Sequence, residues 1–378
     1  MPLNSISLTN LLSFTNAKLD LRPLNVLIGP NAAGKSNLIS AIGLLKAAPD
    51  DLSEAIRRGG GVREWVSKRS DERLLATIDC QIEFGSVGSP LSYSLAFREN
   101  DYSAFQVFSE VLSSPEGGLI FDRTPGRASI RNNPKGAPGE TRVSESESLL
   151  AAYRNPMDPT PITALGKVLG DIRIYREFDT GPASAARNGA SVDSERGGLQ
   201  ECGDNLALVL QDLDFRGKQG VLSKYLQRFW DGAQGVKTKL EGRFVHVHVK
   251  ERGINDPIPA ARLSDGTLKF LCLMAVLLHP EPPPLICIEE PELGLHPDAL
   301  SIVADALREA SQKSQVIVTT HSDALVSDLS DQAESVVVCE RDAAGGTQFK
   351  RLHDMDGWLE RYRLGELWRM GEIGGNRW

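Results

Sequence analysis

The segment with the clearest chemistry is 29–36, where two glycines, a lysine and a serine stand at the spacing G-x-x-x-x-G-K-S. Glycines at both ends let the backbone curl, so that its N–H groups point at phosphate oxygens. A lysine after the second glycine reaches the outer phosphates, and the serine hydroxyl is a magnesium ligand. The pattern predicts a nucleoside triphosphate site. The expected contacts are Gly29, Pro30, Asn31, Ala32, Ala33, Gly34, Lys35, Ser36 and the following Asn37.

The segments on either side of this loop have the form that such a site needs. Residues 24–28 (LNVLI) predict a short buried strand, and residues 35–46 (KSNLISAIGLLK) predict an amphipathic helix. Strand, glycine turn and helix in this order place the positive end of the helix dipole at the phosphates. The alternative is a glycine-rich turn with an incidental lysine, and the flanking strand and helix disfavour it.

A second stretch with clear chemistry lies at 284–290, where the apolar run PLICI ends in Glu289 and Glu290. The metal-binding strand of phosphate-loop NTPases has this form. Glu289 is predicted to bind magnesium, and Glu290 to orient and polarise the attacking water. The alternative is that two acids after a strand simply begin a loop.

Three further segments argue against that alternative. Residues 263–267 (LSDGT) precede a predicted helix over 268–279, with Ser264 as its N-cap. Residues 294–298 (GLHPD) follow the acidic pair and open another helix. Residues 316–322 (VIVTTHS) predict a strand that ends near His321, and strand ends line the phosphate crevice of open α/β sheets.

Together and in this order, these segments resemble the head domains of the ABC superfamily, in the branch that contains SMC, RecF and OLD-type ATPases. The sequence looks most like the standalone ABC-type AAA-family ATPases of bacteria, on the strength of SDGT at 264–267 and IEEPELGLHP at 288–297. The C-terminal LGELW at 364–368 and GEIGG at 371–375 look like the ending of that group. The resemblance covers about 3–112 and about 172 to the end.

The resemblance implies a magnesium-dependent ATPase whose cofactors are ATP and Mg²⁺. It makes 29–36 the Walker A loop, with Lys35 on the phosphates and Ser36 on the metal. Glu289 and Glu290 become the Walker B pair, the first a metal ligand and the second catalytic. His321 becomes the switch histidine that contacts the γ-phosphate.

The resemblance also implies a partner, because the family's signature segment acts on the nucleotide of another protomer. ATP then lies between the Walker A loop of one copy and the signature segment of the other, so the hydrolysing unit is a head-to-tail homodimer. The contacts implied for the signature segment and the D-loop are Ser264, Asp265, Gly266, Thr267 and Asp298.

Two positions depart from the usual ABC pattern. Glu289 stands where most ABC proteins have aspartate, and its extra methylene changes the reach to magnesium. Slow hydrolysis is therefore expected, and an ATP-binding switch that regulates a partner stays open as an alternative. The glutamine loop is not assigned, either to Gln81 or to Glu177.

The fold class expected is α/β, with a mainly parallel core sheet, an antiparallel β subdomain and an irregular insertion. Alternating runs at 75–84, 91–98 and 105–112 predict the antiparallel strands. Residues 113–171 are rich in Gly, Pro, Ser, Asn and Arg and predict a flexible insertion. The expected domains are thus an N-terminal lobe at 1–112, the insertion at 113–171, and a C-terminal lobe at 172–378.

The lengths between the motifs bound what else the chain carries. The 264 − 36 = 228 residues between Ser36 and Ser264 show no sustained heptads, so no SMC-type coiled coil is expected. The 378 − 321 = 57 residues after His321 are too few for the Toprim nuclease domain of OLD-type proteins. An effector such as a nuclease is therefore expected on a separate chain. By resemblance, the setting is DNA maintenance or defence against phage and other foreign DNA.

Composition and charge limit which partners and which cellular compartment are expected. The net charge of −8 argues against electrostatic DNA binding by the whole surface, and leaves a local basic groove open. Residues 57–73 hold six basic and three acidic side chains, either a solvated face or a contact for DNA or a partner. Five scattered cysteines, the absence of a leader, and no apolar run long enough for a bilayer predict a soluble cytoplasmic protein without a membrane anchor.

Overall fold

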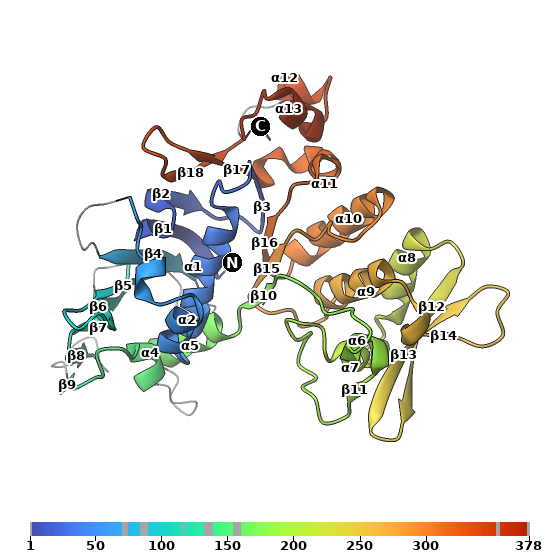
Figure 1. The fold of residues 1–378 in the computed structure, drawn as a ribbon, viewed down its shortest axis with the longest axis horizontal. Helices are drawn as coiled ribbons and strands as arrows, with labels where there is room; N and C mark the ends of the chain where they lie inside the picture. The colour runs from blue at the N-terminus through green and yellow to red at the C-terminus, as the bar shows by residue number, and fades with distance from the viewer. Residues whose placement is uncertain are drawn as a thin grey trace. The chain divides into compact units, whose positions relative to one another are not determined.

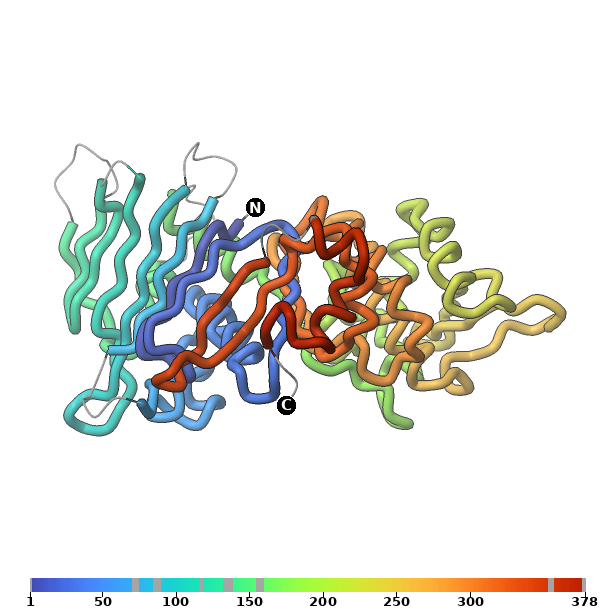
Figure 2. The backbone as a smooth tube through the Cα atoms, turned by 90° about the horizontal axis from the view of Figure 1, so that it is seen from above, coloured from blue at the N-terminus to red at the C-terminus, as the bar shows by residue number. Residues whose placement is uncertain are grey.

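The computed structural model describes residues 2–69, 75–83, 90–115, 118–131, 139–153, 160–352 and 356–375. The chain divides into two compact units, and each unit is built from segments that are distant in sequence. Unit 1 comprises Met1–Ile172, Val337–Leu352 and Ile373–Trp378, and unit 2 comprises Arg173–Val336 and His353–Glu372. Figures 1 and 2 follow the chain by residue number through both units.

Unit 1 contains an eight-stranded antiparallel sheet of order β2-β1-β4-β5-β6-β7-β8-β9. Its strands alternate between buried and more exposed residues, as in the BiBeBeB pattern of β4, because successive side chains of a strand point to opposite faces. The three antiparallel runs predicted from alternation are confirmed as β4, β5 and β6. The bounds are β1 (Leu3–Leu11), β2 (Phe14–Asp20), β4 (Ala76–Ile82), β5 (Leu91–Glu99), β6 (Phe105–Ser113), β7 (Leu119–Thr124), β8 (Arg127–Ile130) and β9 (Gly139–Thr141).

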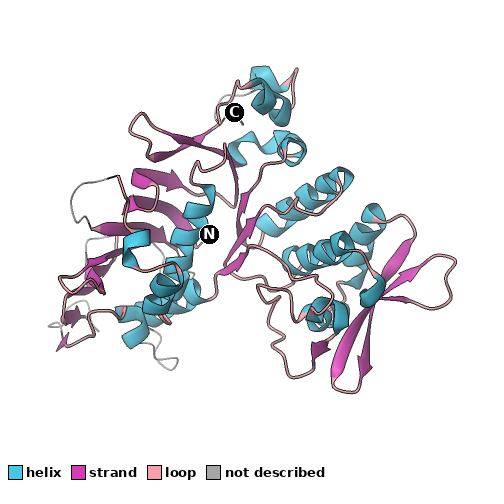
Figure 3. Cartoon of the chain, viewed as in Figure 1, coloured by secondary structure: helices cyan, strands magenta, loops and turns pink. Residues whose placement is uncertain are grey.

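The remaining elements of unit 1 surround the predicted phosphate loop. Strand β3 (Leu24–Ile28) is buried along its whole length, and α1 (Lys35–Ala47) follows the loop, which confirms the predicted strand and helix. In this unit β3 lies next to β17 (Val336–Arg341), which forms an antiparallel hairpin with β18 (Thr347–Arg351). Two short helices follow α1 in the chain, namely α2 (Leu52–Arg58) and α3 (Val62–Trp65) (Figure 3).

Residues 113–171, expected to be an irregular insertion, carry regular elements instead. Strands β7, β8 and β9 extend the antiparallel sheet, and two helices follow them, α4 (Leu149–Ala152) and α5 (Pro161–Gly170). Pro161, Gly166 and Gly170 lie within α5, whereas Gly126 lies in the turn between β7 and β8, where its φ is +77°. The Asn132–Gly136 stretch lies outside the described residues.

A buried carboxylate ties this segment to the sheet. Glu110 of β6 has no solvent exposure, and it accepts hydrogen bonds from the Tyr93 hydroxyl (3.0 Å), the Ser148 hydroxyl (2.8 Å) and the Leu149 amide (2.7 Å). Burial raises the pKa of Glu110, and these donors oppose the shift. Because Ser148 is also the N-cap of α4, the network holds the start of that helix against β5 and β6.

Unit 2 contains a parallel sheet whose strands end at one edge. Its order is β10 (Arg173–Tyr175), β15 (Leu285–Glu289) and β16 (Gln315–Thr319), and both strand pairs are parallel. The runs of β15 and β16 are apolar almost throughout, as expected for parallel strands that are covered on both faces. The strands predicted over 172–175, 284–290 and 316–322 are thereby confirmed. Their carboxyl ends bring together the acidic pair and the segment before His321.

The other elements of unit 2 carry the signature segment and a second sheet of order β11-β13-β12, with β14 beside β13. Strand β12, which sequence analysis did not identify, has a mostly exposed second half without clear alternation. The strands are β11 (Ala190–Ser191), β12 (Ala233–Glu241), β13 (Phe244–Glu251) and β14 (Ile258–Pro259). The helices are α6 (Ala185–Asn188), α7 (Leu206–Phe215), α8 (Gln219–Phe229), η1 (Ala260–Arg262), α9 (Asp265–Leu277), η2 (Pro297–Ala299), α10 (Leu300–Ser311), α11 (Asp323–Asp328), η3 (Ser330–Ser335), α12 (Asp356–Leu359) and α13 (Leu364–Met370).

Across the described part of the chain, no helix combines the length and the apolar character that crossing a bilayer requires.

The Glu110 network yields a stability prediction. Glu110→Ala should lower the free energy of unfolding by about 3 kcal/mol, because three buried donors lose their acceptor. Glu110→Gln keeps one acceptor oxygen and should cost less. Urea unfolding of both variants, with the exposed Glu83→Ala as the matched control, measures the difference. Equal stability of Glu110→Ala and Glu83→Ala would contradict this account of the segment.

Candidate functional site

The predicted phosphate loop in unit 1 is shaped by two positions at which no side chain fits. Gly29 has a φ of +145°, and a Cβ there would lie 2.3 Å from the backbone oxygen of Cys339 in β17. Gly34 has a φ of +103°, and a Cβ there would lie 2.3 Å from Oγ1 of Thr347 in β18. The loop therefore curls tightly against the β17–β18 hairpin, and this curl directs its backbone in the way that phosphate binding requires.

The polar side chains of the loop are held by the loop itself and by its neighbours. Lys35 is buried, and its Nζ donates to the carbonyl oxygens of Gly29 (2.8 Å) and Pro30 (3.0 Å). Ser36, at the start of α1, is exposed. Asn37 donates to the Ser13 hydroxyl at 2.8 Å.

Two residues that sequence analysis missed also hold the loop. Arg341 Nη2 donates to the carbonyl oxygen of Ala32 at 2.6 Å, and Thr347 Oγ1 donates to that of Ala33 at 2.8 Å. Both residues lie more than 300 positions from the loop in sequence. No motif surrounds them, so only the three-dimensional structure identifies them.

A recess in unit 1 lies beside Ser13 and Asn37 and is also lined by Lys68 and Arg69. It brings part of the basic segment 57–73 next to the loop. The other described arginines of that segment are paired, Arg57 and Arg58 with Glu54 and Arg63 with Glu99. Arg73 lies outside the described residues. The paired arginines fit a solvated face better than a DNA contact.

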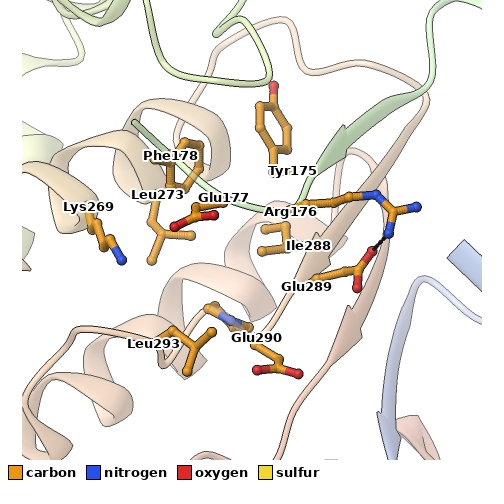
Figure 4. Close-up of a pocket in the computed structure, with 11 residues that line it drawn as sticks. Tyr175, Arg176, Glu177, Phe178, Lys269, Leu273, Ile288, Glu289, Glu290 and Leu293 are labelled. Atoms are coloured by element: carbon orange, nitrogen blue, oxygen red, sulfur yellow. Dashed lines mark ion pairs between the residues drawn. The ribbon is translucent and has the colours of Figure 1, made fainter. Parts of the chain in front are cut away.

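The acidic pair in unit 2 lies at the carboxyl end of β15, in a pocket with Arg176, Glu177 and Lys269 (Figure 4). Glu289 is largely buried, and its Oε1 lies 2.5 Å from Nη1 of the half-exposed Arg176. Arg176 directly follows β10, the parallel neighbour of β15, and this strand pairing accounts for the contact. Sequence analysis did not assign Arg176.

Glu290 has an unusual backbone conformation, with a φ of +47°. Such a conformation is rare for residues other than glycine and concentrates at functional sites. It is held in place by a hydrogen bond from the Glu290 amide to the carbonyl oxygen of Thr319 (2.9 Å). The carboxylate of Glu290 lies 3.7 Å from Nε2 of His321, so the predicted catalytic acid and the predicted switch histidine are neighbours in this unit.

Glu292 positions the segment that carries His321. Its Oε1 accepts hydrogen bonds from the Thr320 hydroxyl (2.8 Å) and from the His321 amide (2.7 Å). Burial raises the pKa of Glu292, and these two donors oppose the shift. Sequence analysis included Glu292 in the IEEPE segment but assigned it no role. Its position two residues after the acidic pair was the one feature of the sequence that could have indicated a role.

The predicted signature segment begins α9. Ser264 is confirmed as the N-cap, because its hydroxyl accepts from the Thr267 amide at 3.1 Å. A Cβ on Gly266 would lie 2.8 Å from the carbonyl oxygen of Gly294, so the signature and D-loop segments pack together. Asp298 is exposed and lies 3.3 Å from Nδ1 of His296.

The predicted site residues thus fall into two groups. The loop residues from Gly29 to Asn37 belong to unit 1, whereas Glu289, Glu290, His321 and the signature and D-loop segments belong to unit 2. Among the described residues, no three His, Cys, Asp or Glu side chains are grouped as metal ligands. A magnesium ion in a nucleotide site needs only one or two protein oxygens besides phosphate and water. The Ser36 hydroxyl and the Glu289 carboxylate are oxygen donors of that kind.

Residues 24–327 match the family described as "AAA domain, putative AbiEii toxin, Type IV TA system". The chain belongs to this AAA-domain family. No curated protein matched.

Solved structures show what fold the family member adopts. A crystal structure of the SmcHead bound to the C-winged helix domain of ScpA has a TM-score of 0.55 at 13% identity, covering 95% of this chain and 99% of that one. An Smc head with an extended coiled coil, bound to the C-terminal domain of ScpA from Pyrococcus furiosus, has a TM-score of 0.56 at 14% identity, with coverages of 95% and 98%. This AAA domain therefore has the fold of an SMC-type ATPase head.

The shape of the phosphate loop yields a second prediction. Gly29→Ala should lower the free energy of unfolding by about 3 kcal/mol or more, because the new Cβ strains φ and also meets a backbone oxygen. Gly126→Ala is the matched control, since its φ is +77° but no atom lies within 4 Å of the place that its Cβ would take. The control should lose about 1 kcal/mol from φ strain alone. Urea unfolding compares the two, and equal losses would contradict the steric account.

Proposed function

We propose that this AAA domain binds and hydrolyses ATP with magnesium. The observation that carries the proposal is the loop of unit 1, which curls around Gly29 and Gly34 where no Cβ fits and leads into α1. Backbone N–H groups of the loop and the N-terminus of α1 receive the phosphates. When ATP binds, the Lys35 ammonium leaves the carbonyl oxygens of Gly29 and Pro30 and binds the outer phosphates instead. Ser36 supplies a metal ligand.

The acidic pair supplies the other proposed roles. Glu289 would hold Mg²⁺, which would neutralise phosphate charge when bound. Glu290 orients the attacking water and accepts its proton, and His321, 3.7 Å from Glu290, contacts the γ-phosphate. The hydrogen bonds that Glu292 accepts keep the His321 backbone in register with the acidic pair.

We further propose that ATP joins two copies head to tail. Ser264 and Asp265 are exposed at the start of the 13-residue helix α9, where the helix N-terminus offers amide donors. The signature segment of one copy then binds the γ-phosphate of ATP held by the loop of the other, which gives two composite sites. The SMC-head fold supports this arrangement by analogy.

The recess beside the loop is proposed as the base side of the nucleotide site. Ser13 and Asn37 connect it to the phosphate loop, and Arg69 adds a positive charge, whereas Lys68 is paired with Glu64 of the same recess. A flat base and a ribose fit such a recess, since polar groups at its rim supply hydrogen bonds.

One observation favours the alternative of a slow-turnover switch. Oε1 of Glu289 lies 2.5 Å from Nη1 of Arg176, so the guanidinium competes with a metal ion for this carboxylate. An ATP-bound state that persists is well suited to holding a partner protein.

The biological setting is proposed from the resemblance and from the family description. That description names a putative AbiEii toxin of a type IV toxin–antitoxin system. For this chain we propose a role in DNA maintenance or in defence against phage and other foreign DNA, with a separately encoded effector such as a nuclease.

The test is steady-state phosphate release from ATP and Mg²⁺, with mass measured in solution. Lys35→Ala should abolish nucleotide binding and turnover. Glu290→Gln should bind ATP, lose turnover by about 100-fold or more, and accumulate an ATP-dependent dimer. Glu83→Ala is the control for removal of a surface acid. ATP binding by wild type without any turnover would favour the switch, and retained turnover in Lys35→Ala would contradict the proposal.

A further inference from the structure

The signature turn contains a charge that opposes its proposed ligand. Asp265 is the first residue of α9, and its side chain is 69% exposed. A carboxylate at the N-terminus of a helix is favourable for the helix itself. It repels a phosphate that approaches the same amides, however, because like charges a few ångströms apart destabilise each other.

Arg187 of α6 contacts this turn through its guanidinium group. Its Nη2 lies 2.5 Å from Oδ1 of Asp265, and its Nη1 donates to the carbonyl oxygen of Leu263 at 2.6 Å. The same guanidinium donates through Nη1 to the carbonyl oxygen of Ala260 (3.3 Å) and through Nε to that of Thr180 (3.1 Å). The Arg187 side chain is only 14% exposed.

These contacts join two stretches of unit 2 that are distant in sequence. Thr180 lies in the loop before α6, whereas Ala260 begins η1 and Leu263, the residue after η1, directly precedes the Ser264 cap. A planar guanidinium with five donors in a fixed geometry can hold several carbonyl oxygens at once, which the single ammonium of lysine cannot do in the same way. One side chain, more than 70 residues away in sequence, thus makes several of the contacts that hold the turn.

We infer that Arg187 is a positioning residue of the composite ATP site. It fixes the backbone from Leu263 to Asp265 and neutralises the Asp265 carboxylate, so that the N-terminus of α9 accepts the γ-phosphate of ATP bound to another copy. Arg187 itself does not touch the nucleotide. The inference rests on the proposed head-to-tail pair, and it adds the residue that prepares the signature segment for the phosphate.

The first measurement is turnover and ATP binding of Arg187→Ala. Turnover should fall about 10- to 100-fold, because several charge-assisted hydrogen bonds to the turn are lost. ATP affinity of the dilute protein should stay within about twofold of wild type, since the phosphate loop is part of unit 1. Arg187→Lys keeps the charge beside Asp265 and should also lose most turnover, because the carbonyl contacts need the guanidinium. Full turnover in Arg187→Ala would overturn the inference.

The decisive measurement is complementation between two inactive variants. Lys35→Ala has an intact signature segment, and Arg187→Ala has an intact phosphate loop. In an equal mixture, each mixed dimer has one intact composite site, so turnover should return to roughly a quarter of wild type under random pairing. If Arg187 were needed only for the folding of its own copy, mixing with Lys35→Ala would not restore turnover. If Arg187→Ala does not fold, Arg187→Lys takes its place in the mixture.

A control mixture separates failure of this inference from failure of the proposed function. Ser264→Arg blocks the exposed signature segment directly, and mixing it with Lys35→Ala should restore turnover to the same degree. Restoration with Ser264→Arg but not with Arg187→Ala or Arg187→Lys would overturn the role of Arg187 and leave the head-to-tail pair intact. No restoration in any mixture would overturn both.

Discussion

The phosphate loop of unit 1 packs so closely against β17 and β18 that no Cβ fits at Gly29 or Gly34, and the curled loop therefore requires glycine at both positions. The loop is encoded near the start of the chain, whereas the hairpin that confines it is encoded near the end. Thr347 and Arg341 add hydrogen bonds across the same contact. A local sequence motif is thus given its conformation by a distant segment, and this dependence explains why unit 1 includes residues from both ends of the chain.

In unit 2 the corresponding constraint is the parallel pairing of β10, β15 and β16. Parallel strands end at a common edge, and this edge collects Arg176, Glu289, Glu290 and the segment before His321. The positive φ of Glu290 and the burial of the Glu292 carboxylate each cost folding free energy at this edge. Such concentration of strain and buried charge is typical of functional sites.

The sequence was most informative where the signal is local. The strand at 24–28, the helix after the loop, the Ser264 cap and the strand before Glu289 depend on periodicity and capping within a few residues, and each is present as predicted. The elements within 113–171 were missed because the segment is rich in Gly, Pro and Ser, and because the start of α4 is held by a carboxylate distant in sequence, Glu110. Strand β12 was missed because its exposed half does not alternate. Arg187 and Arg176 were missed because their contacts join residues that are distant in sequence, and no local motif marks them.

The central claim is that ATP lies between the phosphate loop of one copy and the signature segment of another. The most direct test is an experimental structure of Glu290→Gln with ATP and Mg²⁺. The account predicts phosphates on the loop from Gly29 to Ser36, and the start of α9 from a second copy at the γ-phosphate. Nucleotide bound to a single copy with its γ-phosphate facing solvent, or bound away from this loop, would contradict the account.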